Sequence, residues 1–155
     1  LQIAESVAHL NPDREFIENA AMLHDIGVFM TKSKKIGCTG DLPYVCHGFL
    51  GRQLLDEIGP EYGLDGRYGL VCERHTGAGI TRENIISNNL PLPKRDMVPR
   101  SLEEKIICVA DKFHSKTPKK RDKVYTVDAI ARSLSRIDHG HGNRFLQMAT
   151  ELGLV

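Results

Sequence analysis

Along most of this chain, apolar residues recur every three or four positions, which is the spacing of one face of an α-helix. Strict alternation of apolar and polar residues, the pattern of a half-buried strand, is not found over a useful length. The pattern predicts an all-α fold, a single-domain helical bundle. The predicted helices are 1–10, 12–23, 43–58, 64–75, a short one opening at 81, a long one opening at 101, and two within 126–152 separated by a turn over 136–142.

Residues that favour helix ends or loops set these boundaries. Asn11-Pro12-Asp13 predicts a helix start with proline at the first helical position. Ser101 followed three residues later by Glu104 is a capping-box pattern. Residues 31–41 are rich in lysine and glycine and are predicted to form a loop, and the three prolines within 88–100 predict a rigid irregular connection.

Composition places the chain among ordinary soluble globular proteins. Its 155 residues are 41% apolar and 26% charged, which suits one domain with a real core. The net charge of +1 gives no general field for nucleic acid or a membrane surface. The four cysteines form no close C-x-x-C pair, so we predict reduced thiols in a cytoplasmic protein, although four cysteines could in principle pair.

An imidazole and a carboxylate end the second predicted helix. His24 and Asp25 directly follow the small apolar run 20–23 and precede Gly27. Both side-chain types are common ligands of divalent metals, so a shared ion is one interpretation. The other is a hydrogen bond between the two where the helix ends. The pair alone leaves both interpretations open.

Three further polar residues stand at unusual positions on other predicted helices. His47 lies near a helix start, His75 ends a helix, and Asp111 sits inside an apolar run, where a carboxylate is costly to bury unless it is paired or bound. Singly, His47 could be a surface residue, His75 could cap its own helix, and Asp111 could pair with Lys112. The groups can all meet only if the helices pack around one centre. The remaining histidines, His9, His114, His139 and His141, are interpreted as structural or exposed.

In order and flanking residues, this set resembles the HD-domain superfamily of metal-dependent phosphohydrolases, specifically its HDIG-type members. Leu23-His24-Asp25-Ile26-Gly27 matches the signature, and Arg74-His75-Thr76-Gly77 and the stretch 104–112 are similar to the later motifs. The resemblance covers nearly all of residues 1–116. The C-terminal part adds little to it.

The resemblance implies an all-α fold with a buried, binuclear metal centre. His24, Asp25 and Asp111 are expected to hold one divalent ion, and His47 and His75 a second, with Asp25 bridging them and acting in catalysis. Iron or manganese is the natural expectation for the family, and cobalt, nickel or zinc also suits such ligands.

The chain departs from the family pattern at two positions. The family's first ligand is a histidine on the opening helix, and His9 lies too close to His24 to serve. Apolar residues already have helical spacing from Leu1 onward, so the N-terminal helix is interpreted as truncated. We therefore expect that histidine just upstream of Leu1. Many relatives carry lysine where this chain has Val28, and Lys112 or the basic run 116–123 is expected to substitute.

The function implied is hydrolysis of a phosphate ester or anhydride by a metal-bound hydroxide. A nucleotide is the favoured substrate, and symmetrical cleavage of dinucleoside polyphosphates is an alternative. Cyclic dinucleotides are disfavoured because the glycine-tyrosine-proline motif is missing. Lys112 and Arg74 are the first candidates to bind substrate. Further candidates are Lys32, Lys34, Lys35, Lys119, Lys120 and Arg121.

Two other kinds of site remain as alternatives. The pocket could bind a nucleotide or a metal without turnover. A structural zinc site is disfavoured because such sites are usually rich in cysteine, and the cysteines here lack the spacing. The predicted partner is a phosphorylated small molecule or nucleotide, with no membrane and no stable nucleic-acid complex, and the oligomeric state is not indicated by the sequence.

Overall fold

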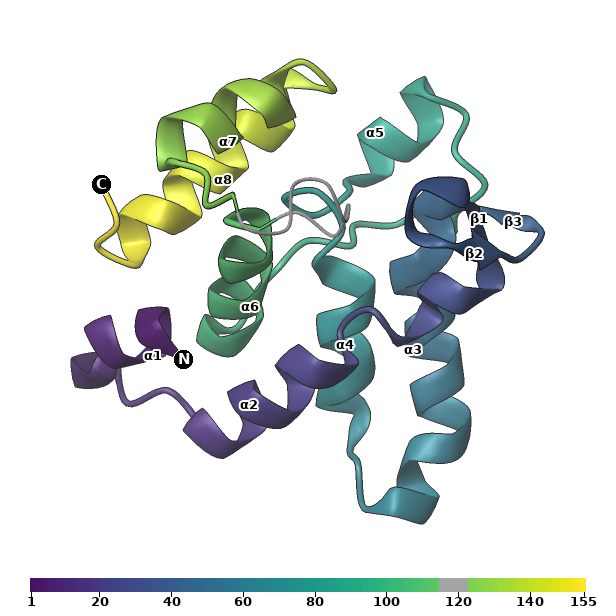
Figure 1. Cartoon of the computed structure of the whole chain (residues 1–155), viewed down its shortest axis with the longest axis horizontal. Coiled ribbons are helices and arrows are strands. Elements are labelled where there is room, and N and C mark those ends of the chain that lie inside the picture. Colours follow the sequence, from purple (N-terminus) through teal and green to yellow (C-terminus); the bar gives the residue numbers. More distant parts are fainter. Residues whose placement is uncertain (115–122) are drawn as a thin grey trace.

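The computed structural model describes residues 1–114 and 123–155. Most of them lie in helices, as predicted, and a small three-stranded sheet was not predicted (Figure 1). The basic run 116–123 lies outside the described residues except for Lys123. The α-helices are α1 (Gln2–Ser6), α2 (Arg14–Leu23), α3 (His47–Ile58), α4 (Gly66–Arg74), α5 (Arg82–Ser87), α6 (Leu102–Lys112), α7 (Val127–Ser135) and α8 (His139–Glu151).

Several helices begin at a residue whose side chain caps the helix, and these starts differ from the predicted ones. The side chain of Asp13 accepts the Phe16 N–H at 3.0 Å, so α2 begins at Arg14, and the prediction that Pro12 is its first helical residue was wrong. Asp65 likewise begins α4 two residues later than predicted, and Asp138 begins α8 inside the predicted turn 136–142. The capping aspartate fixes the first residue of each helix because its carboxylate accepts an otherwise unpaired N–H. The apolar spacing indicates only which stretch is helical.

The predicted capping box at Ser101 is only half formed. Ser101 Oγ accepts the Glu104 N–H at 3.2 Å, as expected. The Glu104 carboxylate instead accepts the Arg100 N–H at 2.6 Å and two bonds from Arg74. Glu104 therefore joins α6 to α4 rather than closing the box.

The predicted loop 31–41 forms part of the sheet. Strands β1 (Thr31–Ser33), β2 (Cys38–Thr39) and β3 (Leu42–Pro43) are ordered β2-β1-β3, antiparallel on one side of β1 and parallel on the other. Strands of two or three residues are too short to show alternation, which is why the sequence pattern missed them. Residues 44–46, predicted as the start of a helix, form a 3-10 turn that leads into α3.

The main core surrounds α6. This helix contacts α1, α2, α4 and α8, and it contributes Ile106, Ile107 and Val109, each at most 3% exposed. A smaller apolar cluster lies between α3 and the segment 80–97. The end of α6 that carries Asp111 is thereby held next to the ends of α2 and α4.

Close backbone approach joins α3 to its neighbours on two sides. A Cβ at Gly27, in the 3-10 turn Ile26–Met30, would lie 2.2 Å from the His47 carbonyl oxygen and 2.4 Å from the Gly51 nitrogen. A Cβ at Gly48 would lie 2.4 Å from the Cys72 carbonyl oxygen on α4. Only residues without a side chain fit at these two crossings.

The four cysteines are free thiols, in agreement with the predicted reduced state. Burial raises the pKa of Cys108 to about 11 and that of Cys72 to about 12, so both stay protonated near neutral pH. Across the two described stretches of chain, no helix combines the length and apolarity needed to cross a bilayer.

The substitution Gly27→Ala tests the crossing with α3. We expect it to lower the free energy of unfolding by about 1–3 kcal/mol, because the added methyl group meets backbone atoms that cannot rotate away. Denaturant titration followed by circular dichroism measures this. The control Gly66→Ala, at the start of α4 with nothing within 4 Å of the new Cβ, should change stability by no more than about 0.5 kcal/mol. Equal stability of the two variants would refute the packing argument.

Candidate metal centre

The ends of several helices bring the five predicted ligands together. His24 and His75 are the residues that follow the last turns of α2 and α4, and His47 is the first residue of α3. Asp25 lies between α2 and the turn Ile26–Met30, and Asp111 lies in the last turn of α6. His47 and His75 are only 2% and 1% exposed, so these two imidazoles face the interior, whereas His24 is half-buried.

Each of the three imidazoles is oriented by its own backbone turn. His24 Nδ1 donates to the Ala21 carbonyl at 2.6 Å, His47 Nδ1 to the Tyr44 carbonyl at 2.7 Å, and His75 Nδ1 to the Cys72 carbonyl at 2.8 Å. A carbonyl oxygen only accepts, so the hydrogen of each neutral ring is on Nδ1 and the lone pair is on Nε2. This is the tautomer that presents Nε2 to a metal ion.

The Nε2 atoms and two carboxylates meet at short distances. Asp25 Oδ1 lies 3.2 Å from His75 Nε2 and 3.5 Å from His47 Nε2, and Asp25 Oδ2 lies 3.3 Å from His24 Nε2. His24 Nε2 is also 3.3 Å from Asp111 Oδ1. Asp25 therefore contacts all three histidines and uses a different oxygen on each side.

These atoms form two sets whose members lie within 4.8 Å of one another. One set is His24, His75 and Asp111, and the other is Asp25, His47 and His75. His75 belongs to both sets, whereas the resemblance assigned the bridging position to Asp25. The five residues converge as predicted. His75 belongs to both sets and therefore connects them, in addition to Asp25, which contacts histidines of both.

The donor set fits a cation. His47 Nε2 and His75 Nε2 are 3.1 Å apart, and with both hydrogens on Nδ1 their lone pairs face each other. Such an arrangement is repulsive unless a proton or a metal ion lies between the rings. Imidazole nitrogen and carboxylate oxygen together are ligands that suit divalent transition metals.

The electrostatics differ between His24 and His75. Burial alone lowers the pKa of His24, but the hydrogen bonds and charges of Asp111 and Asp25 outweigh burial and raise that pKa to about 9. Complete burial lowers the pKa of His75, in spite of the opposing effect of Asp25. Without metal, His24 carries a proton between two carboxylates at neutral pH, and it would have to release that proton from Nε2 to serve as a metal ligand.

The two predicted substrate-binding residues have different surroundings. Lys112 Nζ donates to Asp111 Oδ2 and lies at the edge of the centre. Arg74 Nη1 donates to both oxygens of the buried Glu104 at 2.8 and 3.0 Å, which engages its guanidinium in an ion pair between α4 and α6. Substrate binding by either residue stays a prediction. Lys32, Lys34 and Lys35 are exposed, and Lys119, Lys120 and Arg121 lie outside the described residues.

The turn that follows His75 is held by α8. The Ala78 N–H donates to His141 Nδ1 at 3.3 Å, and Arg144 donates to the carbonyls of Ala78 at 3.2 Å and Gly79 at 2.9 Å. Arg144 also donates to Asn84 Oδ1 at 3.1 Å. His141 is buried, so of the two interpretations given for it, structural or exposed, the second is wrong. Its role was missed because the partners of His141 and Arg144 in this turn are backbone atoms 63 to 66 residues away, which no motif reveals.

Comparison with known proteins gives a family match over most of the chain. A family model described as "HD domain" matches residues 1–116. "Uncharacterized protein MJ0778" of Methanocaldococcus jannaschii is 39% identical over 99 residues, which are 64% of this chain and 48% of that protein. No solved structure matches the chain.

Two further relatives carry the name "tRNA (cytidine(56)-2'-O)-methyltransferase". The protein of Picrophilus torridus is 38% identical over 103 residues, 66% of this chain and 25% of that protein. The protein of Thermoplasma volcanium is 33% identical over 101 residues, 65% of this chain and 25% of that protein. In all three relatives, the match with this chain covers less than half of the protein's length.

Removing His75 tests whether it links the two ligand sets. We expect His75→Ala to lose metal from both sets, whereas His47→Ala loses metal from only one, because His47 belongs to one set. Elemental analysis after loading with Mn²⁺ gives the metal content per chain. His9→Ala, at an exposed position, is the control and should match the unchanged protein. Full metal content in His75→Ala would contradict the grouping.

Substitution of Arg144 tests whether α8 supports the centre through the turn 76–79. We expect Arg144→Met to weaken metal binding by about tenfold, the lower end of the range for groups that position ligands. Competition with a chromophoric chelator measures the affinity, and Arg132→Met on the exposed face of α7 is the control. A loss of stability with unchanged metal affinity would limit Arg144 to a structural role.

Proposed function

The chain belongs to the HD-domain family, and on that basis we propose that it is a metal-dependent phosphohydrolase that cleaves a phosphate ester or anhydride. The observation that carries the proposal is the convergence of three Nε2 atoms and two carboxylates from four separate segments of chain. The chain spans less than half of its curated relatives, so the proposal concerns the reaction of this domain.

Histidine and aspartate residues of both sets would hold the ions. His24, His75 and Asp111 form one side, and Asp25 and His47 complete the other together with His75. Divalent ions bound there supply Lewis acidity toward a phosphoryl oxygen and lower the pKa of a water molecule. Two ions, with iron or manganese as first candidates, suit this set of ligands.

The protein's own residues position the reacting groups. The two carboxylate oxygens of Asp25 lie within 3.5 Å of the Nε2 atoms of His24, His47 and His75. Asp25 is therefore the candidate to orient the attacking water. Lys112 holds Asp111 Oδ2, so its ammonium group lies where it can also offset the charge of a phosphoryl group. Both are proposals that depend on the same centre.

A nucleotide is the substrate class that the family resemblance favours. Symmetrical cleavage of a dinucleoside polyphosphate differs from monoester hydrolysis in its products, two nucleotides rather than an alcohol and phosphate. Product analysis therefore separates these two possibilities. We also propose that the domain works on small phosphorylated molecules without forming a stable nucleic-acid complex, in line with its net charge of +1.

The alternative is a domain that binds a nucleotide or metal without turnover. The methyltransferase relatives support it, because the segment that matches this chain makes up 25% of proteins named for a different reaction. Most of the length of those proteins lies outside the match, so their names do not extend methyl transfer to this chain.

Metal removal tests the proposed reaction. We expect phosphate release from a panel of esters, nucleotides and dinucleoside polyphosphates to stop after chelation and to return with added Mn²⁺ or Fe²⁺. Asp25→Asn should lower kcat by at least about a hundredfold, since it removes the charge shared by both sides. Asp41→Asn, at an exposed position, is the matched control. Turnover that survives verified metal removal would end the proposal, and nucleotide binding without any turnover would favour the alternative.

A further inference from the structure

Tyr44 contacts His47 in two ways. The Tyr44 carbonyl oxygen accepts the His47 Nδ1–H at 2.7 Å, and the phenol ring stacks on the imidazole, with 4.6 Å between the ring centroids and 29° between the ring planes. Stacked aromatic rings at such a separation attract each other. The carbonyl therefore fixes the tautomer of His47, and the phenol ring restrains the tilt of its imidazole plane.

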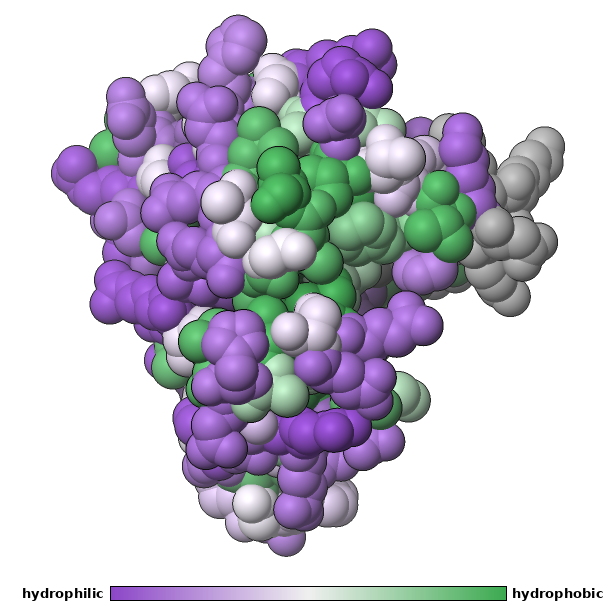
Figure 2. Space-filling view, turned by 90° about the vertical axis from the view of Figure 1, so that its left-hand side faces the viewer, coloured by the Kyte–Doolittle hydropathy of each residue, from purple (hydrophilic) through white to green (hydrophobic). Residues whose placement is uncertain are grey.

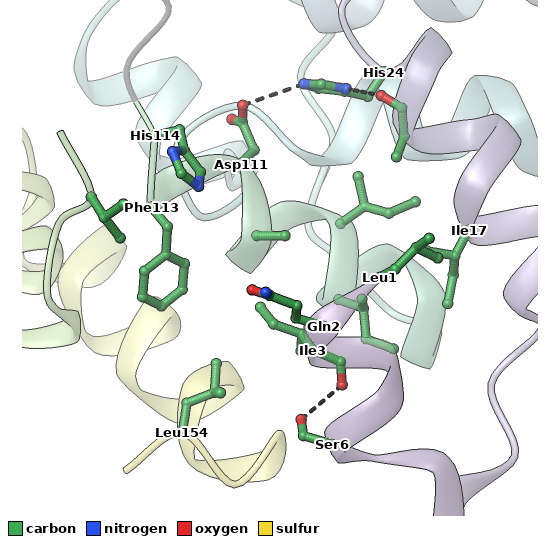
Figure 3. Close-up of a pocket in the computed structure, with 15 residues that line it drawn as sticks. Leu1, Gln2, Ile3, Ser6, Ile17, His24, Asp111, Phe113, His114 and Leu154 are labelled. Carbon is green, nitrogen blue, oxygen red and sulfur yellow. Dashed lines mark hydrogen bonds and ion pairs between the residues drawn. The ribbon is translucent and has the colours of Figure 1, made fainter. Parts of the chain in front are cut away.

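His24, in contrast, has hydrogen-bond partners at both ring nitrogens. Its Nδ1 donates to the Ala21 carbonyl at 2.6 Å, and its Nε2 lies 3.3 Å from Asp111 Oδ1 (Figure 3). The Nε2 of His47 instead faces the Nε2 of His75 at 3.1 Å, where two lone pairs repel each other in the absence of a cation. The stacked phenol ring therefore restrains the His47 imidazole whether or not an ion is bound at Nε2.

The backbone around Tyr44 is fixed by the small sheet and by the smaller apolar cluster. Pro43 of β3 pairs with Lys32 of β1, and β1 directly follows the 3-10 turn after Asp25. Two residues beyond Tyr44, Cys46 is buried in the smaller apolar cluster. The sheet therefore connects the segment that carries Asp25 with the segment that leads into α3.

We propose that Tyr44 is a positioning residue of the metal centre, whose ring holds His47 in the orientation that binds an ion together with Asp25 and His75. The inference rests on the metal centre of the proposed function, but not on the hydrolysis of any substrate. An imidazole that binds a divalent cation takes on part of the positive charge, and the face of a phenol ring attracts positive charge. The stack therefore stabilises the metal-bound form of His47 more than the free form.

Tyr44 lies away from the large apolar band on the molecular surface. In Figure 2, hydrophobic residues gather in a central band on the face that lies to the left in Figure 1, where α1, α7 and α8 are found. The sheet that precedes Tyr44 lies on the opposite side in Figure 1. A change of the Tyr44 side chain therefore leaves that band intact, and its effect on metal binding reports on the centre.

Replacement of the ring tests the proposal through metal binding rather than turnover. The full chain is titrated with Mn²⁺ in competition with a chromophoric chelator, and His47→Ala identifies the binding step that uses His47. We expect Tyr44→Leu to weaken this step by about threefold to tenfold, as the loss of an aromatic pair predicts, and to leave the other step unchanged. Tyr44→Phe keeps the ring and should bind Mn²⁺ as the unchanged protein does. Tyr62→Leu, at a position that is 73% exposed, is the matched control.

The same variants separate positioning from general stability. Tyr44 is 37% exposed, so leucine fits there with little risk to folding, and denaturant titration without metal measures any loss of stability. Equal weakening of both steps is the result of general loosening and would overturn the proposal. A loss in Tyr44→Phe as large as that in Tyr44→Leu would assign the effect to the hydroxyl group and would also overturn it. So would unchanged affinity in Tyr44→Leu, or a His47→Ala variant that alters neither step.

Phosphate release from the panel of esters and nucleotides separates this inference from the proposed function. Selective weakening of one step by Tyr44→Leu, in a chain that releases phosphate from none of these compounds, supports the positioning role and defeats the hydrolase. Release that requires Mn²⁺, together with two unchanged binding steps in Tyr44→Leu, does the reverse.

Discussion

The arrangement of the metal centre depends on how closely three stretches of backbone approach one another. Gly27 lets the turn after α2 rest on α3, and Gly48 lets α3 rest on α4. A side chain at either crossing would push the two backbones apart. The distances between the imidazoles and carboxylates of the centre would then exceed those of hydrogen bonds. The 3.1 Å separation of His47 and His75 is therefore a result of backbone packing some residues away from the imidazoles themselves.

The second constraint is electrostatic. His24 and His75 each follow the last turn of a helix, where the unpaired carbonyls give the helix end a partial negative charge. Two carboxylates, Asp25 and Asp111, lie beside them. Lys112 and the proton on His24 offset part of this negative potential. The site therefore favours cations, which is consistent with its chemistry in either proposed role.

The sequence predicted the helical class and the convergence of five polar side chains well. A charged or polar side chain within an apolar run is costly to bury unless it has a partner, so its position in the sequence indicates a site, as for Asp111. The short strands around residues 31–43 escaped because they are too brief to show a period. The grouping of the ligands, the ion pair of Arg74 with Glu104 and the support from α8 depend on distances between remote segments, which no local pattern encodes.

The bonds that orient the three histidines all run to a carbonyl three residues earlier, in Ala21, Tyr44 and Cys72. Only main-chain carbonyls accept these three bonds, although the Tyr44 ring also stacks on His47 at 4.6 Å between centroids and Cys72 is fully buried. The tautomer of each ring is therefore set by a backbone turn and not by the chemistry of a neighbouring side chain. An engineer who moved one of these four-residue turns to another helix would carry the ring's orientation along with it.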